Sequence, residues 1–174
     1  MFKSIVVAYD GSAHARKALE AASTLAAAVK SRVGIIFVIE AGRAHLPENI
    51  REMGEVEHII EPMPKSVVNL ENAPANMENN LASSSAASQR AMMQYADYLL
   101  EQARKSANAV GVSDIEVKAA LGDAAEEVAE FASERDADLI VCGSRGHGGL
   151  KKLLLGSTSH KIAQLAECSC LTVK

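Results

Sequence analysis

The segment SIVVAYDGSAHARKALEAASTLAAAVKSRVGIIFVI, which runs from Ser4 to Ile39, holds two apolar runs on either side of an alanine-rich stretch. Apolar runs of this length predict strands buried on both faces, here over residues 4–9 and 33–39. Between them, alanine and leucine recur every three or four residues, and Ser12 is placed to cap a helix that continues through Lys30. A strand, a helix and a strand in this order predict a parallel β-α-β unit.

This regular pattern stops at residue 42. Residues 42–85 contain all four prolines, six of the seven asparagines, three basic residues and seven acidic ones. We therefore expect an acidic, Pro- and Asn-rich insertion within a single domain of residues 1–174. The insertion is either a solvated spacer or a lid or partner-docking segment, and residues 48–57 within it are compatible with a short helix.

Ordered elements are expected again from about Ala86. Further strands are expected over residues 115–120, 138–142 and 170–173. Helices are expected from about residue 86 to Gly111, from Asp123 to about Arg135, and after Gly156. The apolar face of the first of these helices is predicted to contain Met92, Tyr95, Ala96, Leu99, Ala103, Ala107 and Val110. The alternation predicts an α/β fold in which helices cover both faces of a five-stranded open parallel sheet.

Charge and composition argue against several classes of partner and location. The formal net charge of −4 argues against nucleic acid as a partner, because nucleic-acid binding needs concentrated positive charge. No apolar stretch is long enough for a secretory signal or for insertion into a membrane. The three cysteines are too few for a disulfide framework, which favours a reducing, cytoplasmic location.

Glycine spacing after the strand predicted at residues 138–142 points to an anion site. Gly143-Ser144-Arg145-Gly146 is followed, nine residues later, by Gly156-Ser157-Thr158-Ser159, where a helix should begin. Glycines allow backbone amides to approach an anion closely, and the free N–H groups of a helix start bind phosphate. Two such sites suit a polyphosphate. The basic residues of this region are Arg145, Lys151, Lys152 and Lys161.

Asp10 follows the first strand, and ligands of open α/β sheets bind beyond the carboxyl ends of the strands. Its carboxylate is placed to accept hydrogen bonds from ribose hydroxyls or to help hold Mg²⁺, and the alternative is a simple turn or cap residue. Backbone groups near Val38, at the end of the second strand, are placed to line an adenine site. The glycine pattern is neither the Walker sequence nor the dinucleotide fingerprint.

These residues resemble the universal stress protein family. The resemblance rests on IVVAYDGS at Ile5–Ser12, on DLIVCGSRGHGG from Asp138, and on the family pattern G-2x-G-9x-G-[S/T]. It covers residues 2–41 and 87–174. It implies a Rossmann-like, three-layer α/β/α fold, akin to the adenine-nucleotide alpha-hydrolases, with strand order 3-2-1-4-5. It also implies a homodimer paired through Leu171–Val173.

Family members that keep the glycine pattern typically bind ATP, so the resemblance implies ATP as the cofactor, with or without Mg²⁺ at Asp10. The contacts implied by the family pattern are Ala8, Tyr9, Asp10, Val38, Cys142, Gly143, Arg145, Gly146, Gly156, Ser157, Thr158 and Ser159.

No catalytic residue is predicted, and we expect a regulatory ATP-binding protein of the stress response with little or no turnover. The alternatives are a slow ATPase or phosphotransferase, and a module that acts through the insertion on a protein partner such as a transporter or enzyme.

Overall fold

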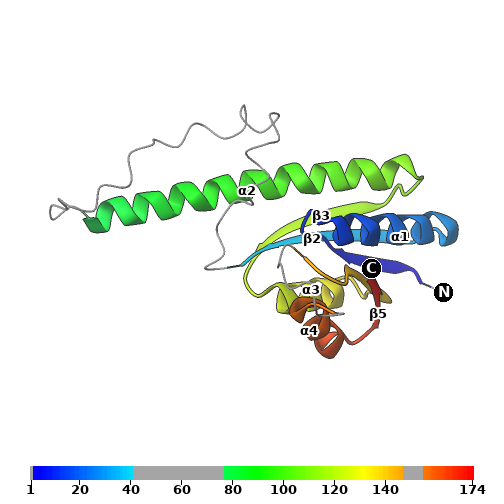
Figure 1. Cartoon of the computed structure of the whole chain (residues 1–174). Helices are drawn as coiled ribbons and strands as arrows, with labels where there is room; N and C mark the ends of the chain where they lie inside the picture. The colour runs from blue at the N-terminus through cyan, green and yellow to red at the C-terminus, as the bar shows by residue number, and fades with distance from the viewer. Residues whose placement is uncertain (1, 41–76, 147–154) are drawn as a thin grey trace.

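A five-stranded parallel sheet in the order β3-β2-β1-β4-β5 forms the centre of the molecule (Figure 1). The computed structural model describes residues 2–40, 77–146 and 155–174. The elements are β1 (Ser4–Ala8), α1 (Ala13–Val29), β2 (Arg32–Ile39), α2 (Met77–Ala109), β3 (Ile115–Leu121), α3 (Ala124–Glu134), β4 (Leu139–Gly143), α4 (Ser157–Leu165) and β5 (Ser169–Val173). The expected fold class and strand order are both confirmed.

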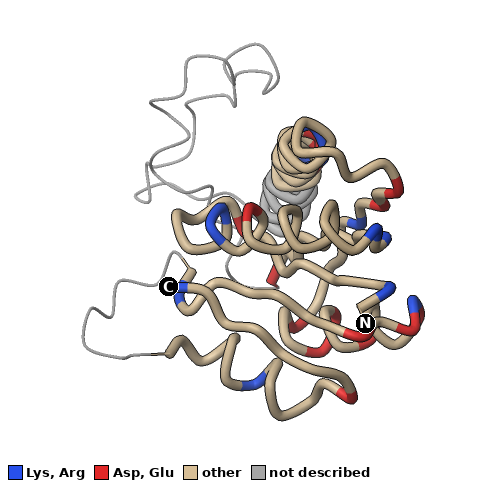
Figure 2. The backbone as a smooth tube through the Cα atoms, turned by 90° about the vertical axis from the view of Figure 1, so that its right-hand side faces the viewer, with Lys and Arg blue, Asp and Glu red and all other residues tan. Residues whose placement is uncertain are grey.

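The sheet lies between two helical layers, which can be followed in Figures 1 and 2. Alternate residues of β1 enter two separate cores. Ile5 and Val7 pack beneath α1 and α2, whereas Val6 packs against α3 and α4. All three side chains are fully buried, as the continuous apolar run predicted for a strand covered on both faces.

Helix α2 begins at Met77, so the prediction that regular structure returns only near Ala86 is wrong. The chain from Met77 to Ala109 has no proline or glycine, and the last proline is Pro74. The three serines at 83–85 lower helix propensity only modestly, by about 0.5 kcal/mol each relative to alanine, so they do not end a helix. Residues 42–76 of the predicted insertion, including the suggested helix at 48–57, lie outside the described residues.

The buried face of α2 largely follows the prediction, with two differences. Leu100 is 2% exposed and enters the core, while Leu99 beside it is only partly buried. Val110 is exposed, because the helix ends at Ala109 and the chain turns there. Gly111 adopts a φ of 98°, which confirms its predicted place just beyond the helix end.

Each remaining helix starts at its predicted cap. The Ser12 side chain accepts a hydrogen bond from the amide of Ala15, and Asp123 accepts from those of Ala125 and Glu126. Gly156 is the N-cap of α4. Among the described residues, no helix is long and apolar enough to cross a membrane.

Candidate functional site

The carboxyl ends of β1 and β4 lie side by side at the point where the strand order reverses. Ala8 pairs in register with Cys142, and Gly143 pairs with Val173 of β5. Tyr9 continues the backbone of β1 and donates its amide to the carbonyl of Ile36 at 2.9 Å. In open α/β sheets this reversal point is where ligands bind.

Asp10 lies against the glycine segment. Its Oδ1 accepts a hydrogen bond from the amide of Ser12 at 2.9 Å, which confirms the turn role considered for it. A Cβ placed on Gly146 would collide with Oδ2, the other carboxylate oxygen of Asp10. The fold therefore brings Asp10 and Gly146 together, although they are separated by most of the sequence.

Ser12 joins the same two segments from the other side. Its hydroxyl caps α1 by accepting from the amide of Ala15 at 3.1 Å, and it donates to the carbonyl of Arg145 at 3.4 Å. The turn after β1 and the glycine segment after β4 thus form one structure, to which both Asp10 and Arg145 belong.

Ser144 connects the two halves of the glycine pattern. Its carbonyl accepts from the amide of Gly156 at 2.8 Å, and its amide donates to the carbonyl of Val173 at 2.6 Å. A Cβ on Gly156 would lie 3.3 Å from the Ser144 oxygen, closer than an ordinary contact, so glycine suits this approach. The two glycine sites, nine residues apart in the sequence, therefore meet in space.

The three hydroxyl residues at the start of α4 differ in what they can offer a ligand. Ser159 is 4% exposed, and its hydroxyl donates to the carbonyl of Gly156 at 2.9 Å. Ser157 is exposed and Thr158 is half-buried. Ser157 and Thr158 are therefore the residues of this turn open to an anion, while Ser159 holds the turn together.

Gly143 has a packing role that the sequence did not reveal. A Cβ there would lie 2.8 Å from the backbone carbon of His14 and 2.9 Å from the amide nitrogen of Ala15. Helix α1 thus sits directly on Gly143. Packing of α1 is a sufficient reason for this glycine, whereas sequence reasoning explained it by the approach of an anion.

The charge near the site is less positive than the sequence suggested. Lys161 binds the carboxylates of Asp123, the N-cap of α3, at 3.0 Å and of Glu126, in the first turn of α3, at 2.9 Å. These ion pairs form because α3 packs beside α4, and they offset the positive charge of Lys161. Lys151 and Lys152 belong to residues 147–154, which lie outside the described part of the chain.

Apolar surface is available at the strand ends. Ala8 and Val38 are partly exposed and border the core beneath α3 and α4. Cys142 next to Ala8 is 3% exposed, and burial raises the pKa of its thiol. Only its backbone is therefore available to a ligand, whereas Ala8 and Val38 offer side chains.

Two polar residues that the sequence analysis did not assign to the site lie near Asp10. Arg16 of α1 donates from Nη1 to the carbonyl of Gly11 at 2.5 Å. Burial raises the pKa of Tyr95 on α2, and nearby Tyr9 and Asp10 raise it further. Neither residue belongs to a recognisable motif, so only the fold reveals their position.

Within the described ranges, no group of three or more histidine, cysteine or acidic side chains is arranged to hold a metal ion. A magnesium ion at Asp10 would take its remaining ligands from phosphate oxygens and water, as is usual for this ion.

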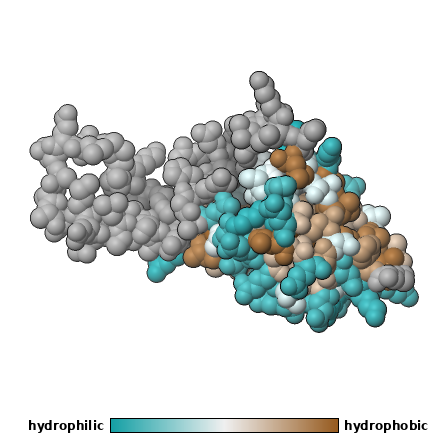
Figure 3. All heavy atoms as spheres, turned by 90° about the horizontal axis from the view of Figure 1, so that it is seen from below, coloured by the Kyte–Doolittle hydropathy of each residue, from teal (hydrophilic) through white to brown (hydrophobic). Residues whose placement is uncertain are grey.

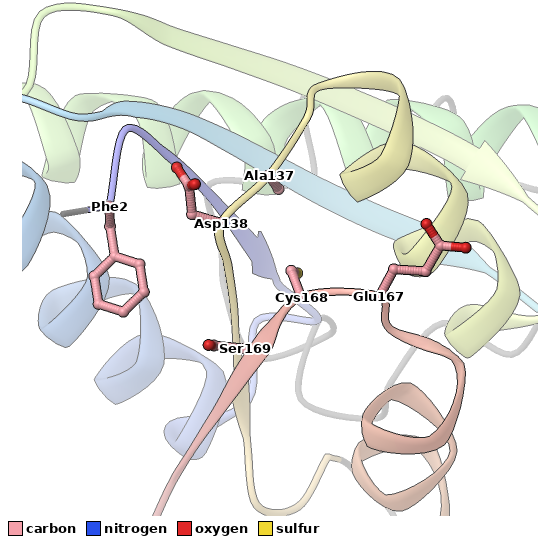
Figure 4. Close-up of a pocket in the computed structure, with 6 residues that line it drawn as sticks. All are labelled: Phe2, Ala137, Asp138, Glu167, Cys168 and Ser169. Carbon is pink, nitrogen blue, oxygen red and sulfur yellow. The ribbon is translucent and has the colours of Figure 1, made fainter.

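A shallow hollow lies at the amino ends of the strands, at the opposite end of the sheet from the candidate site. It is lined by Phe2, Ala137, Asp138, Glu167, Cys168 and Ser169, at the amino ends of β4 and β5 (Figure 4). The Asp138 carboxylate accepts from the backbone amides of Lys3 and Ser4, at 2.6 and 3.0 Å, and does not converge with that of Glu167. Figure 3 shows that the lower side of the molecule mixes hydrophilic and hydrophobic areas.

The fold and the glycine motif at the carboxyl ends of its strands are those expected of the universal stress protein family, and comparison with known proteins agrees with that expectation. A sequence model of the universal stress protein family matches residues 1–174. The chain is 33% identical to universal stress protein YxiE of Bacillus subtilis over 177 aligned residues, which cover all of both proteins. The chain belongs to the universal stress protein family.

Solved structures share the fold. Hypothetical protein MJ0577 is 24% identical, with a TM-score of 0.65 over 100% of this chain and 96% of that one. A universal stress protein crystallised in complex with cAMP is 22% identical, with a TM-score of 0.63 over 99% of this chain and 97% of that one.

Proposed function

We propose that this chain binds ATP at the carboxyl edge of β1 and β4 and acts as a cytoplasmic regulator in the stress response. The observation that carries the proposal is the meeting of Asp10 with Gly146 beside the start of α4. A carboxylate for ribose or Mg²⁺ lies there beside a glycine segment and a helix start that suit phosphates.

Each part of the nucleotide has a suitable partner in this arrangement. Ala8 and Val38 supply apolar contact for adenine, with the backbones of Tyr9 and Cys142 at its edge. The proposed phosphate contacts after β4 are the amides of Gly143 and Gly146 and the side chain of Arg145. The phosphate contacts of the α4 turn are the amides and hydroxyls of Ser157 and Thr158, with Gly156 and Ser159 maintaining the turn.

Family membership and the solved complex of a related fold with cAMP support a nucleotide as the ligand. A binding role is favoured over turnover because efficient phosphoryl transfer needs a metal clamp and a positioned base. Asp10 is held by the amide of Ser12 and packs on Gly146, which suits a fixed ligand contact better than proton transfer. A slow ATPase remains the alternative.

The proposed regulator is a homodimer joined through Leu171–Val173 of β5. This strand ends the sheet on the side of β4, and Leu171 is 42% exposed. An edge strand presents unpaired backbone groups, which a second copy of the chain can satisfy while covering Leu171. The proposed regulated partner is a protein such as a transporter or enzyme.

Equilibrium dialysis with ATP and Mg²⁺ tests the nucleotide proposal. Wild type is compared with Gly146→Val, which places a side chain against Asp10, and with Asp10→Ala. Asp97→Ala, an exposed aspartate of α2, is the matched control. We expect ATP retention by wild type and the control, and loss in the two site variants. Absence of binding by wild type at millimolar ATP would disprove the proposal.

An assay of phosphate release on the same proteins separates regulator from enzyme. A regulator retains ATP with negligible release. Release by wild type that Asp10→Ala abolishes and Asp97→Ala leaves intact would instead support the ATPase.

A further inference from the structure

The turn that carries Asp10 is held by α2 as well as by its own neighbours. Gly11 has a φ of 77°, a conformation that favours glycine. A Cβ built on Gly11 would lie 3.0 Å from Cδ1 and 3.4 Å from Cδ2 of Leu99. The end of the Leu99 side chain therefore rests against the backbone of the residue that follows Asp10.

The preceding turn of α2 is fixed against the sheet. Tyr95 is 6% exposed, and its ring meets that of Phe37 edge to face, with centroids 6.1 Å apart. Phe37 belongs to β2, next to Val38 at the proposed adenine site. This contact ties the segment containing Tyr95 and Leu99 to the strand ends of the site.

Gly11 is thus held on two sides. Arg16 of α1 donates to its carbonyl, while Leu99 of α2 packs against its Cα. Asp10, directly before it, must place one oxygen on the amide of Ser12 and the other beside Gly146. A shift of the Gly11 backbone would move both of these contacts.

We infer that Leu99 is a positioning residue for nucleotide binding, which acts by holding the Gly11 turn so that Asp10 faces Gly146. The inference rests on the proposed function and makes α2 a third support of the site, beside the two loops. Leu99 contacts Gly11, the residue after Asp10, so its effect on binding passes through Asp10.

The next residue of the helix provides a matched control. Leu100 is 2% exposed within the main core, whereas Leu99 is partly buried and supplies all three of the atoms nearest to a Cβ on Gly11. Leucine-to-alanine substitution removes the same atoms at both positions. A purely structural role predicts that Leu100→Ala is the more harmful change for both stability and ATP affinity. The positioning role predicts that Leu100→Ala loses more stability but that Leu99→Ala loses more ATP affinity.

The experiment measures ATP affinity by calorimetry and stability by urea denaturation for full-length wild type, Leu99→Ala, Leu100→Ala and Leu99→Met. Affinity is measured at a temperature at which circular dichroism shows each protein folded. We expect Leu100→Ala to unfold at the lowest urea concentration but to bind ATP within about twofold of wild type. Leu99→Ala should bind about 3- to 30-fold more weakly, the range typical of residues that act on a site through neighbours.

Leu99→Met retains a side chain long enough to reach Gly11 and should restore affinity to within about twofold, because leucine and methionine are nearly equal in volume. If Leu99→Ala does not fold, Leu99→Val replaces it, with a smaller loss expected. Wild-type affinity in Leu99→Ala, or equal losses in both alanine variants, overturns the inference alone. Absence of ATP binding by wild type overturns the proposed function, and the inference with it.

Discussion

Substitution of Gly143 by alanine tests whether this glycine is required for packing. The new Cβ would lie 2.8 Å from the backbone carbon of His14 and 2.9 Å from the nitrogen of Ala15, short of the 3.4 Å at which ordinary contact begins. Both obstacles are backbone atoms in the first turn of α1, which cannot rotate away as a side chain does. Relief requires α1 to move off the sheet.

The expected cost lies in the upper part of the range for overpacked cores, about 2–3 kcal/mol in the free energy of unfolding. For a chain of this size, that corresponds to a melting temperature lower by roughly 4–12 °C. Urea denaturation and thermal scans of the purified protein without nucleotide measure both quantities.

Gly122→Ala is the matched control. Its Cβ would lie 2.6 Å from Oε1 of Glu127, the far end of a flexible side chain, so rotation of Glu127 removes the conflict. We expect a change within about 0.5 kcal/mol, as for ordinary surface substitutions. Equal losses in the two variants would refute the packing argument. A stable Gly143→Ala protein that fails to bind ATP would assign this glycine to the ligand.

Three further predictions concern the site, Asp138 at the amino end of β4, and the proposed dimer. Gly146→Ala should lower the free energy of unfolding by about 1 kcal/mol more in the wild-type background than in the Asp10→Ala background, where the obstructing carboxylate is absent. Urea denaturation of wild type, the two single variants and the double variant measures this difference. Additive effects of the two substitutions would exclude a contact between Asp10 and residue 146. Hydrogen bonds from the amides of Lys3 and Ser4 lower the pKa of Asp138. The ionised Asp138 carboxylate therefore stabilises the fold fully above the usual aspartate pKa of about 4. This stabilisation is lost as the pH falls through the lowered pKa of Asp138. Asp138→Asn should accordingly be less stable than wild type at pH 7, with the difference vanishing in acid, and a constant difference across denaturation curves from pH 2 to 7 would contradict this. Leu171→Glu on β5 should give a monomer by light scattering, whereas Val117→Glu on the opposite edge strand β3 should leave a dimer, and the reverse result would place the interface elsewhere.

Local chemistry made several elements predictable. The apolar runs of β1 and β4 are buried on both faces, as their composition requires. Ser12, Asp123 and Gly156 cap helices where expected, because a cap depends on a side chain or conformation within a few residues. By contrast, the start of α2 was missed because serines and asparagines suggested a loop, although the absence of proline and glycine permitted a continuous helix.

The candidate site was predictable in part. The glycine spacing identified both segments of the site: Gly146 lies against Asp10, and Gly156 lies against the carbonyl of Ser144. The sequence pattern did not distinguish the exposed Ser157 from the buried Ser159, because both serines are equally compatible with a helix start. Arg16 and Leu99 carry no motif, so their contacts with Gly11 had no signal in the sequence.

The sequence by itself determined where the strands and most helix starts lie, because burial of an apolar run and capping of a helix depend on nearby residues. The matched motif added the family and the sheet order. Only the tertiary structure decided what each residue faces: α1 for Gly143, Asp10 for Gly146, the carboxylates of α3 for Lys161, and Gly11 for Leu99. These contacts join elements that are distant in the chain, and packing of whole helices on the sheet fixes them.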